Sequence, residues 1–386
     1  MRCKLGDISE ITKLAGYEFT KYIKYIPDGE IIAVRALNLK NGALVLDDIQ
    51  RISKEVSETL PRSQLHKNDI VLSYTGTLGE CAQIREDGKY HLAPNVCKIT
   101  PNDSVVNPNF LFQYIRCEKF KQTLINYAHG STQPTIPMST IRDIPVDIPD
   151  DLEKQGKIAA ILSILDEKIA INRAINDNLA DLLQTVYQER FGDTSLIANQ
   201  GILSDICSYS RDKVAVSELN VSTYFSTENM LSGKAGSTEA TSLPTTSQTT
   251  ACHKGDTLIS NIRPYFKKIV YCEDNCGCST DVLCFTPSQP RYSAYLFSTL
   301  YADKFFAFMV AGSKGTKMPR GDKQQIMTYP VVLPSEEELA GFNTIASPLL
   351  EQIYSNSAEN KRLSILRDTL LPKLMSGEID VSAIQL

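Results

Sequence analysis

The chain has 386 residues, of which 42% are hydrophobic and 22% are charged, and its formal net charge is −5. This length suits two or three domains, and this composition is typical of globular proteins and excludes a largely disordered chain. The negative charge excludes a protein that coats nucleic acid through bulk positive charge, but it is compatible with a local basic groove.

The N-terminal sequence and the hydropathy pattern predict a cytoplasmic protein without membrane contact. Residues 1–7 lack the apolar core of a signal peptide, and no apolar run reaches the roughly 18–20 residues of a membrane span. The ten cysteines show no disulfide framework, so we expect reduced thiols. Cys272, Cys276 and Cys278 cluster, but their spacing differs from the paired C-x-x-C pattern of zinc sites. We predict no metal site and keep zinc as the minor alternative.

An internal repeat with an offset of about 185 residues organises the sequence. Lys4–Ile8 is echoed by Ile202–Ile206, and His66–Ser73 is echoed by His253–Ser260. This period is far too long for a solenoid, so it predicts a duplicated domain.

Each copy is predicted to contain short strands followed by a helix, because β-rich runs alternate with Gly, Asn and Pro. In the first copy the strands are Glu30–Val34, Asp69–Ser73 and Val96–Thr100, and the helix is Asn109–Asn126. In the second copy a surface loop at Ser232–Thr250 precedes the strands Asp256–Ser260, Lys268–Cys272 and Asp281–Phe285 and the helix Tyr292–Val310.

A long helix is predicted after each copy. The first begins at Asp150-Asp151-Leu152-Glu153, which resembles a capping box, and the second at Ser335-Glu336-Glu337-Glu338. Seam positions of the first helix alternate in steps of four and three, as in a heptad repeat. They are Ile158, Leu162, Leu165, Ile169, Asn172, Asn176, Leu179, Leu183 and Val186. The seam of the second helix comprises Ile353, Asn356, Asn360, Leu363, Leu370 and Leu374.

The two seams predict that the helices pair with each other, because a long apolar stripe on a single helix needs a partner. Antiparallel pairing gives the chain an approximate two-fold symmetry, and the asparagines in each seam set register and orientation. We expect Pro348 to break or kink the second helix, and Arg367 also falls on its seam. The alternative is a plain coiled-coil stalk for dimerisation.

The predicted fold class is therefore α+β: two duplicated mixed α/β domains separated by two long helices that form an antiparallel intramolecular coiled coil with pseudo-two-fold symmetry. The expected boundaries are 1–150 for the first domain, 151–193 for the first helix, 194–334 for the second domain and 335–386 for the second helix and tail.

Turns at equivalent places in both copies are candidate nucleic-acid contacts, since hydroxyl, amide, basic and aromatic side chains can bind phosphates and base edges. In the first copy they are Ser73, Tyr74, Thr75, Thr77, Ser131, Thr132 and Gln133. In the second copy they are Asn261, Arg263, Tyr265, Lys267, Lys268, Lys314, Lys317, Arg320 and Lys323. The alternative is that these turns are ordinary solvated surface loops.

Short sequence motifs, by their order and their duplication, resemble those of the specificity subunit of type I restriction–modification systems over essentially the whole chain. In the first half the matching words are Lys4–Ile8, Asn68–Ser73, Gly130–Gln133, Ile144–Pro149, Gln155–Ala159 and Leu165–Ile169. In the second half they are Gly255–Ser260, Tyr329–Pro334 and Leu374–Ile379. The departures from the family pattern are Pro348, Arg367 and the altered loop 314–323.

The resemblance implies a recognition subunit for defence against foreign DNA. Each domain is then a target-recognition domain that binds one half of a split, asymmetric site in double-stranded DNA, and the coiled coil sets the spacer. Two modification subunits dock on the helices and methylate adenine with S-adenosylmethionine. Restriction subunits use ATP and Mg to move along DNA and cleave it. This chain itself holds no cofactor.

The sequence also predicts that the chain is no enzyme by itself. It has no Asn/Asp-Pro-Pro-Tyr/Phe word for amino-methylation and no G-x-x-x-x-G-K-[ST] phosphate loop. His66 and His253 repeat at equivalent places, which favours a role in the shared fold, and we assign no catalytic residue. The alternatives are a two-headed coiled-coil adaptor without DNA specificity, and a nucleic-acid-modifying enzyme with an unrecognised active site.

Overall fold

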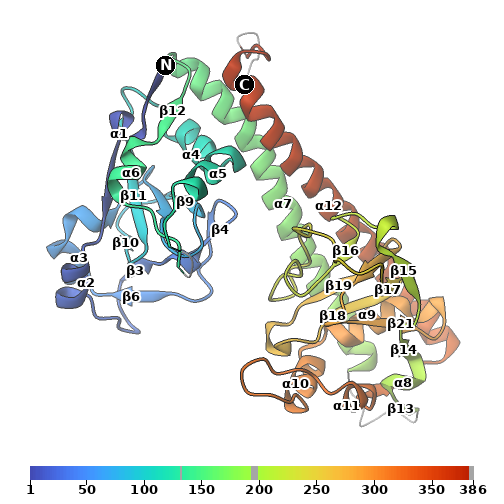
Figure 1. Cartoon of the computed structure of the whole chain (residues 1–386). Coiled ribbons are helices and arrows are strands. Elements are labelled where there is room, and N and C mark those ends of the chain that lie inside the picture. The colour runs from blue at the N-terminus through green and yellow to red at the C-terminus, as the bar shows by residue number, and fades with distance from the viewer. Residues whose placement is uncertain (131–132, 193–198, 382–386) are drawn as a thin grey trace. The chain divides into compact units, whose positions relative to one another are not determined.

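The structure is a computed structural model that describes residues 1–130, 133–192 and 199–381. These residues form two compact units. Unit 1 is Met1–Ile169 with the segment that begins at Lys361, and unit 2 is Ala170–Asn360. Two long helices, α7 (Leu152–Phe191) and α12 (Glu336–Ser376), contribute to both units (Figure 1). We call the part of unit 1 before α7 head one, and the part of unit 2 between the two long helices head two.

Head one contains two four-stranded sheets and two smaller strand pairs. The first sheet has the order β2 (Ser9–Lys13), β11 (Val96–Pro101), β8 (Ile70–Ser73), β9 (Cys81–Gln83). The second has the order β6 (Gln50–Ile52), β3 (Ile31–Val34), β10 (Tyr90–Leu92), β7 (Gln64–Leu65). The small pairs are β1 (Arg2–Lys4) with β12 (Pro145–Asp147), and β4 (Leu39–Lys40) with β5 (Ala43–Leu44). The helices are α1 (Leu5–Ile8), α2 (Gly16–Tyr22), α3 (Lys54–Thr59), α4 (Pro108–Arg116), α5 (Glu118–Asn126) and α6 (Met138–Asp143), with short 3₁₀ helices at Ala36–Asn38 and Pro61–Ser63.

Head two repeats this plan. Its first sheet has the order β14 (Cys207–Tyr209), β21 (Val282–Pro287), β18 (Thr257–Ser260), β19 (Ile269–Tyr271), which matches the first sheet of head one strand for strand. Its second sheet has the order β15 (Lys213–Ala215), β17 (Gln248–Cys252), β20 (Cys276–Cys278), β16 (Tyr224–Phe225). The small pair is β13 (Gln200–Ile202) with β22 (Pro330–Val332). The helices are α8 (Leu203–Ile206), α9 (Ser293–Tyr301), α10 (Asp303–Ala311) and α11 (Lys323–Met327), with 3₁₀ helices at Val216–Glu218, Pro264–Phe266 and Pro290–Tyr292.

The duplication extends to single hydrogen bonds. The buried Asp69 carboxylate accepts from the backbone N–H of His66 at 2.7 Å, and the buried Asp256 accepts from that of His253 at 2.8 Å. The residue before each aspartate has a positive φ, which is +75° at Asn68 and +91° at Gly255. Asparagine and glycine are the residues that tolerate this conformation best, so both copies make the same turn before β8 and β18.

Each predicted head helix is two helices in the structure, and this part of the prediction is wrong. Cys117 separates α4 from α5 and Ala302 separates α9 from α10, both with extended backbone. Cys117 also caps α5, since its Sγ accepts from the N–H of Phe120 at 3.4 Å. The break lets both members of each pair bury apolar side chains, such as Phe110 and Phe120 in head one. The predicted loop 232–250 is also too long, because strand β17 begins at Gln248.

The long helices form part of the core of each unit. In unit 1, Ile158 and Leu162 of α7 and Leu371 and Leu374 of α12 pack in one cluster with residues of head one. In unit 2, rings from both helices surround the head-two residue Tyr295, whose hydroxyl donates to the carbonyl of Val332 at 2.6 Å. These helix rings are Tyr187, Phe191 and Phe342.

Within unit 2 the two long helices pair antiparallel through the predicted asparagines. Asn172 Nδ2 donates to Asn360 Oδ1 at 3.0 Å and to Glu359 Oε2 at 2.7 Å. One turn later, Asn356 Nδ2 donates to Asn176 Oδ1 at 2.8 Å. The residue number increases along α7 as the number of its partner on α12 decreases, so the two helices are antiparallel. Reciprocal amide bonds in a buried seam favour one register, because a shift leaves buried polar groups unpaired.

Within unit 1 the seam residue Arg367 forms an ion pair with a carboxylate of the other long helix. Arg367 Nη1 of α12 lies 3.1 Å from Asp166 Oδ1 of α7, and Arg116 of α4 also pairs with Asp166. Gln113 donates to the same carboxylate at 2.7 Å. Because the single Asp166 carboxylate binds guanidinium groups of both α4 and α12, the departure at Arg367 joins α7, α12 and head one.

Helix α12 runs through Pro348 without a break, so the predicted break does not occur. An interior proline costs about 3 kcal/mol, because it removes one backbone hydrogen bond and crowds the preceding turn. Buried residues on both sides of it, including Ala346 and Leu350, pack into the core of unit 2 and offset this cost. The capping box at Ser335 is present: Ser335 N donates to Glu338 Oε2 at 2.8 Å, and Glu338 N donates to Ser335 Oγ at 3.2 Å.

All the predicted seam residues are buried or half-buried. The structure thus confirms the α+β class, the duplicated domains and the antiparallel pairing of the two long helices. In the described part of the chain, no helix combines the length and the apolar character that crossing a bilayer requires.

Candidate nucleic-acid interface

The predicted turns of head one meet each other in the structure. We call residues 73–79 and 129–136 loop pair one; residues 131 and 132 in it lie outside the described residues. Gly76 N donates to the Pro134 carbonyl at 2.9 Å, and the hydroxyls of Thr75 and Thr135 are 2.7 Å apart. Turns that are about 55 residues apart in sequence therefore form one surface feature next to the end of β8.

The predicted contacts of loop pair one differ in their accessibility. Ser73 is fully buried, and its hydroxyl donates to the carbonyl of Thr77, so the structure gives this side chain a role inside the turn. Tyr74 and Thr75 are half-buried, whereas Thr77 and Gln133 are exposed. The predicted residues Ser131 and Thr132 lie outside the described residues. Thr77 and Gln133 therefore remain as freely accessible hydrogen-bonding groups of this pair.

The predicted turns of head two also meet. We call residues 260–268 and 312–323 loop pair two. Arg263 N donates to the Pro319 carbonyl at 2.8 Å, and Lys314 and Arg320 exchange backbone hydrogen bonds at 2.9 and 3.0 Å. Bridges between Ile262 and Arg320 here, and between Thr75 and Thr135 in loop pair one, occupy equivalent places in the two heads. The sequence repeat thus corresponds to a repeated loop arrangement at the C-terminal ends of the equivalent strands β8 and β18.

Acidic side chains neutralise much of the positive charge of loop pair two. Lys314 pairs with Asp322 at 2.6 Å, and Arg320 pairs with Asp281 at 3.0 Å. Lys267 pairs with Asp303 at 3.0 Å, a carboxylate that also binds Lys234 at 2.7 Å. These lysines lower the pKa of Asp303, so its charge persists at neutral pH.

The remaining predicted residues of loop pair two fall into two groups. Asn261 is buried, and Lys268 donates to the Thr227 carbonyl; burial lowers the pKa of Lys268. Lys317, Lys323 and Tyr265 are exposed, and within the described residues neither lysine has an ion-pair partner. Arg263 is half-buried, and its Nη2 makes only a 3.5 Å contact with the carbonyl of Lys317. The free donors of this pair are therefore Arg263, Lys317 and Lys323.

Three side chains outside the predicted set also belong to the loop pairs. Thr135 completes the hydroxyl pair with Thr75, but its partner is 60 residues away and no local pattern marks it. Phe266 and Met318 are 38% and 48% exposed, next to the basic residues of loop pair two. A Pro-Tyr-Phe word between Arg263 and Lys267 was the available signal, since large apolar side chains between cations are typical of surfaces that contact bases.

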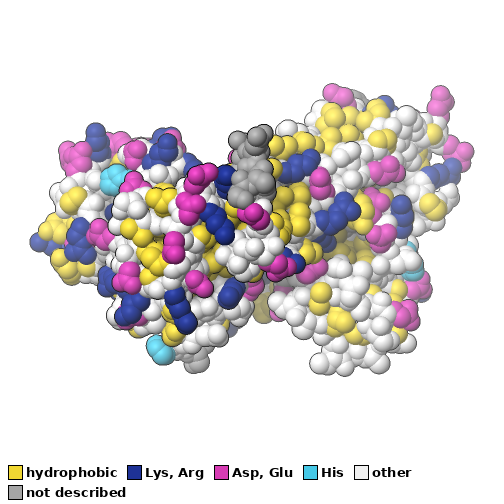
Figure 2. Space-filling view, turned by 90° about the horizontal axis from the view of Figure 1, so that it is seen from above, with side chains coloured by type: hydrophobic (Ala, Val, Ile, Leu, Met, Phe, Trp, Pro, Cys, Tyr) yellow, Lys and Arg dark blue, Asp and Glu magenta, His cyan; other side chains and the backbone are white. Residues whose placement is uncertain are grey.

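The surface carries mixed charge. On the face shown in Figure 2, Lys and Arg side chains alternate with Asp and Glu side chains, and no single basic patch covers it. This distribution agrees with the net charge of −5. Binding of a polyanion to such a surface depends on local loops more than on long-range attraction.

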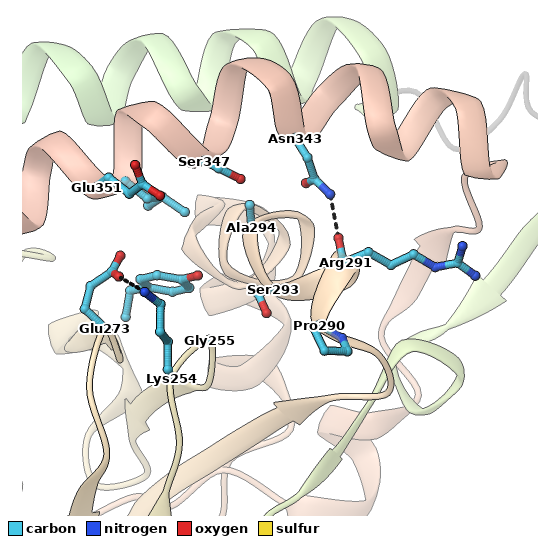
Figure 3. Close-up of a pocket in the computed structure, with 12 residues that line it drawn as sticks. Lys254, Gly255, Glu273, Pro290, Arg291, Ser293, Ala294, Asn343, Ser347 and Glu351 are labelled. Atoms are coloured by element: carbon cyan, nitrogen blue, oxygen red, sulfur yellow. Dashed lines mark hydrogen bonds and ion pairs between the residues drawn. The ribbon is translucent and has the colours of Figure 1, made fainter.

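A pocket of about 410 Å³ lies in unit 2 between head two and α12 (Figure 3). Lys254 and Glu273 of head two form an ion pair at its wall at 3.7 Å, and Asn343 Nδ2 of α12 donates to the Arg291 carbonyl of head two at 2.8 Å. The Asn343–Arg291 bond connects α12 to head two, so the pocket is part of their junction, and loop pair two does not line it. Among the described residues, no three His, Cys, Asp or Glu side chains are arranged to hold a metal ion.

Comparison with known proteins assigns this architecture to a class. The sequence model of a family described as "Type I restriction modification DNA specificity domain" matches residues 1–180. The chain is 22% identical over 316 residues to the type I restriction enzyme MjaIX specificity subunit of Methanocaldococcus jannaschii, covering 73% of this chain and 71% of that one. It is 24% identical over 169 residues to the EcoBI specificity subunit of Escherichia coli, covering 43% of this chain but only 35% of that subunit.

The fold has a solved counterpart. The crystal structure of a type I restriction–modification system S subunit from M. genitalium aligns with a TM-score of 0.52 and 18% identity, covering 97% of this chain and 96% of that chain. The chain thus has the fold of a two-domain specificity subunit. Its first 180 residues match the model of the type I specificity domain, and the chain is similar to type I restriction–modification specificity subunits, in line with the predicted resemblance.

We predict that Asp303→Asn strengthens non-specific binding to double-stranded DNA. The substitution removes the carboxylate that neutralises Lys234 and Lys267. The slope of log K against log salt should become steeper by about one to two, because each additional phosphate contact releases a counterion. Titration of a fluorescent random duplex at several salt concentrations measures this slope. Glu218→Gln changes the net charge equally at an exposed site and serves as the control; an equal change in both variants contradicts the assignment.

Proposed function

We propose that this chain is the sequence-specific DNA-recognition subunit of a type I restriction–modification complex. Each head binds one half of a bipartite, asymmetric target through its loop pair. The observation that supports this most directly is the duplicated head, in which two equivalent loop pairs of different chemistry project from the same sheet edge. Loop pair one offers hydroxyl and amide groups and loop pair two offers cations and aromatic rings, so the two heads are suited to different base sequences.

The partners and cofactors follow from this role. We infer that two modification subunits dock on the paired helices and methylate adenine with S-adenosylmethionine. Restriction subunits then supply ATP- and Mg-dependent DNA translocation and cleavage. The chain contributes recognition, and the coiled coil sets the number of base pairs between the half-sites. The absence of methyltransferase and phosphate-loop words from the full sequence supports this division.

Co-expression with the neighbouring modification subunit tests the proposal. The host must lack adenine methylation, and its DNA is sequenced with detection of modified bases. We expect one split, asymmetric motif with a fixed gap, methylated on both strands. A stable purified complex that leaves the DNA unmethylated contradicts the proposal and favours the two-headed adaptor.

Arg263 provides a test at one residue. Its side chain is half-buried at the base of loop pair two and lacks an acidic partner among the described residues, so it is available for a guanine edge. We expect Arg263→Ala to cost about 1–3 kcal/mol and to relax one half-site only, measured by methylome sequencing of the co-expressed complex. Arg263→Lys should behave similarly, because it keeps the charge but loses the bidentate fork. Lys317→Ala is the control for a phosphate contact and should reduce methylation of all target sequences equally. If Arg263→Ala also reduces methylation of all sequences equally, Arg263 contacts phosphate and does not read a base.

The exposed face of α7 provides a test of subunit docking. Within unit 2, Ile171 and Leu182 are 55% and 47% exposed, and Ile175 is on the same face at heptad spacing. An apolar stripe that remains exposed after the seam is buried marks a protein interface. We expect Ile171→Glu with Ile175→Glu to weaken capture of the modification subunit at least tenfold, measured by size-exclusion chromatography and pull-down. Ala170→Glu adds a charge to the same helix, at an exposed position about 100° round the helix from Ile171, and should leave assembly intact. Unchanged capture by the double variant refutes this docking site.

A further inference from the structure

Five of the ten cysteines lie together in the second core of head two. They come from strands β17, β20 and β21 and from the end of β19, and they pack with Met230, Leu258 and Val282. They are Cys252, Cys272, Cys276, Cys278 and Cys284. None of them contacts loop pair two in the described hydrogen bonds, and all ten cysteines of the chain are free thiols. The proposed recognition function does not account for this cluster.

Two of these thiols are close enough to react with each other. The Sγ atoms of Cys272 and Cys276 are 3.6 Å apart, and only three residues separate them in sequence. Backbone hydrogen bonds hold both ends: Cys272 N donates to the Asp256 carbonyl at 2.9 Å, and Cys276 pairs with Cys252 across β17 and β20. A disulfide needs about 2.05 Å between the sulfurs, a change that side-chain rotation and a small loop shift can supply.

The position of this pair also allows a small oxidant to reach it. The connecting residues Asp274 and Asn275 are exposed, and Glu273 lines the pocket beside α12. Cys276 keeps 6% of its surface exposed at the end of this loop. The neighbouring thiols of Cys252 and Cys272 lower the pKa of Cys276, which favours the thiolate that reacts with oxidants.

We propose that Cys272 and Cys276 are a redox-active dithiol that a hydroperoxide oxidises to an intramolecular disulfide. The Cys276 thiolate attacks a peroxide oxygen, an S–O bond forms, the O–O bond breaks, and the released oxygen leaves as water after protonation. Cys272 then attacks the resulting sulfenic acid, an S–S bond forms, and the hydroxyl leaves as a second water with the Cys272 proton. With hydrogen peroxide, two thiols and one peroxide give one disulfide and two waters.

The disulfide would change the contact between head two and α12. The loop it closes contains Asp274, which accepts a hydrogen bond from the Tyr354 hydroxyl of α12, and Glu273, which pairs with Lys254. Drawing Cys272 and Cys276 together displaces the residues between them. Oxidation therefore acts at the junction that Figure 3 shows, and the loop pairs are left chemically unchanged.

Graded oxidation of the full chain tests the proposal. The purified protein is treated with hydrogen peroxide, free thiols are blocked with N-ethylmaleimide, and peptides are mapped by mass spectrometry. We expect Cys272 and Cys276 to lose their free thiols together and about tenfold faster than Cys207, and to appear as one cross-linked peptide. Cys207 is a control of similar burial, 3% exposed, whose thiol donates to the Leu203 carbonyl. Hydrogen exchange of the loop and of the Tyr354 segment should increase in the oxidised protein.

Two variants separate the steps. Cys272→Ser should stop the cross-link and leave a Cys276 sulfenic acid that dimedone traps, whereas Cys276→Ser should leave Cys272 reduced. If neither variant folds, peptide mapping of the oxidised natural chain still tests whether Cys272 and Cys276 form the disulfide. Three results overturn the proposal: both thiols react no faster than Cys207, Cys276 pairs with Cys252 instead, or the purified chain carries stoichiometric zinc that protects the cluster.

Discussion

Burial of the α7 seam against α12 is the interaction on which both units depend. A single helix of this length cannot bury its apolar stripe, and the structure provides the partner from the same chain. The helices also complete the cores of the heads, since Leu162 and Leu371 pack in unit 1 and Leu183 and Leu350 pack in unit 2. They are therefore structural elements of both units, which argues against a separate stalk that serves only dimerisation.

Polar groups in the seam define how the helices pair. The Asn176–Asn356 bond in unit 2 and the Arg367–Asp166 pair in unit 1 both join α7 to α12 through side chains that are buried or half-buried. Such groups add little net stability, because desolvation offsets much of their attraction. Their effect is on specificity, since any other register leaves them buried without partners.

The two heads share one scaffold and differ in loop chemistry, as the proposed recognition of two unlike half-sites requires. In loop pair two, Lys267, Lys314 and Arg320 pair with Asp303, Asp322 and Asp281. Ion pairing of this kind limits attraction to any polyanion, so the proposed function assigns discrimination to directional groups such as Arg263 and Gln133. The thiol pair lies in another part of head two, near its junction with α12, and the described hydrogen bonds of its thiols do not involve loop pair two.

The sequence by itself determined the α+β fold class, the duplicated domain and the two long helices, because heptad spacing, capping boxes and repeated motifs are local or periodic signals. Only the tertiary structure decided that the helix of each head divides at Cys117 and Ala302, that α12 continues through Pro348, and that Ser73 is buried. It also decided that Asp303 neutralises Lys267 and that Cys272 meets Cys276. These outcomes depend on which surfaces the folded chain brings together, and packing free energy between distant segments outweighs the local preferences that a sequence pattern displays.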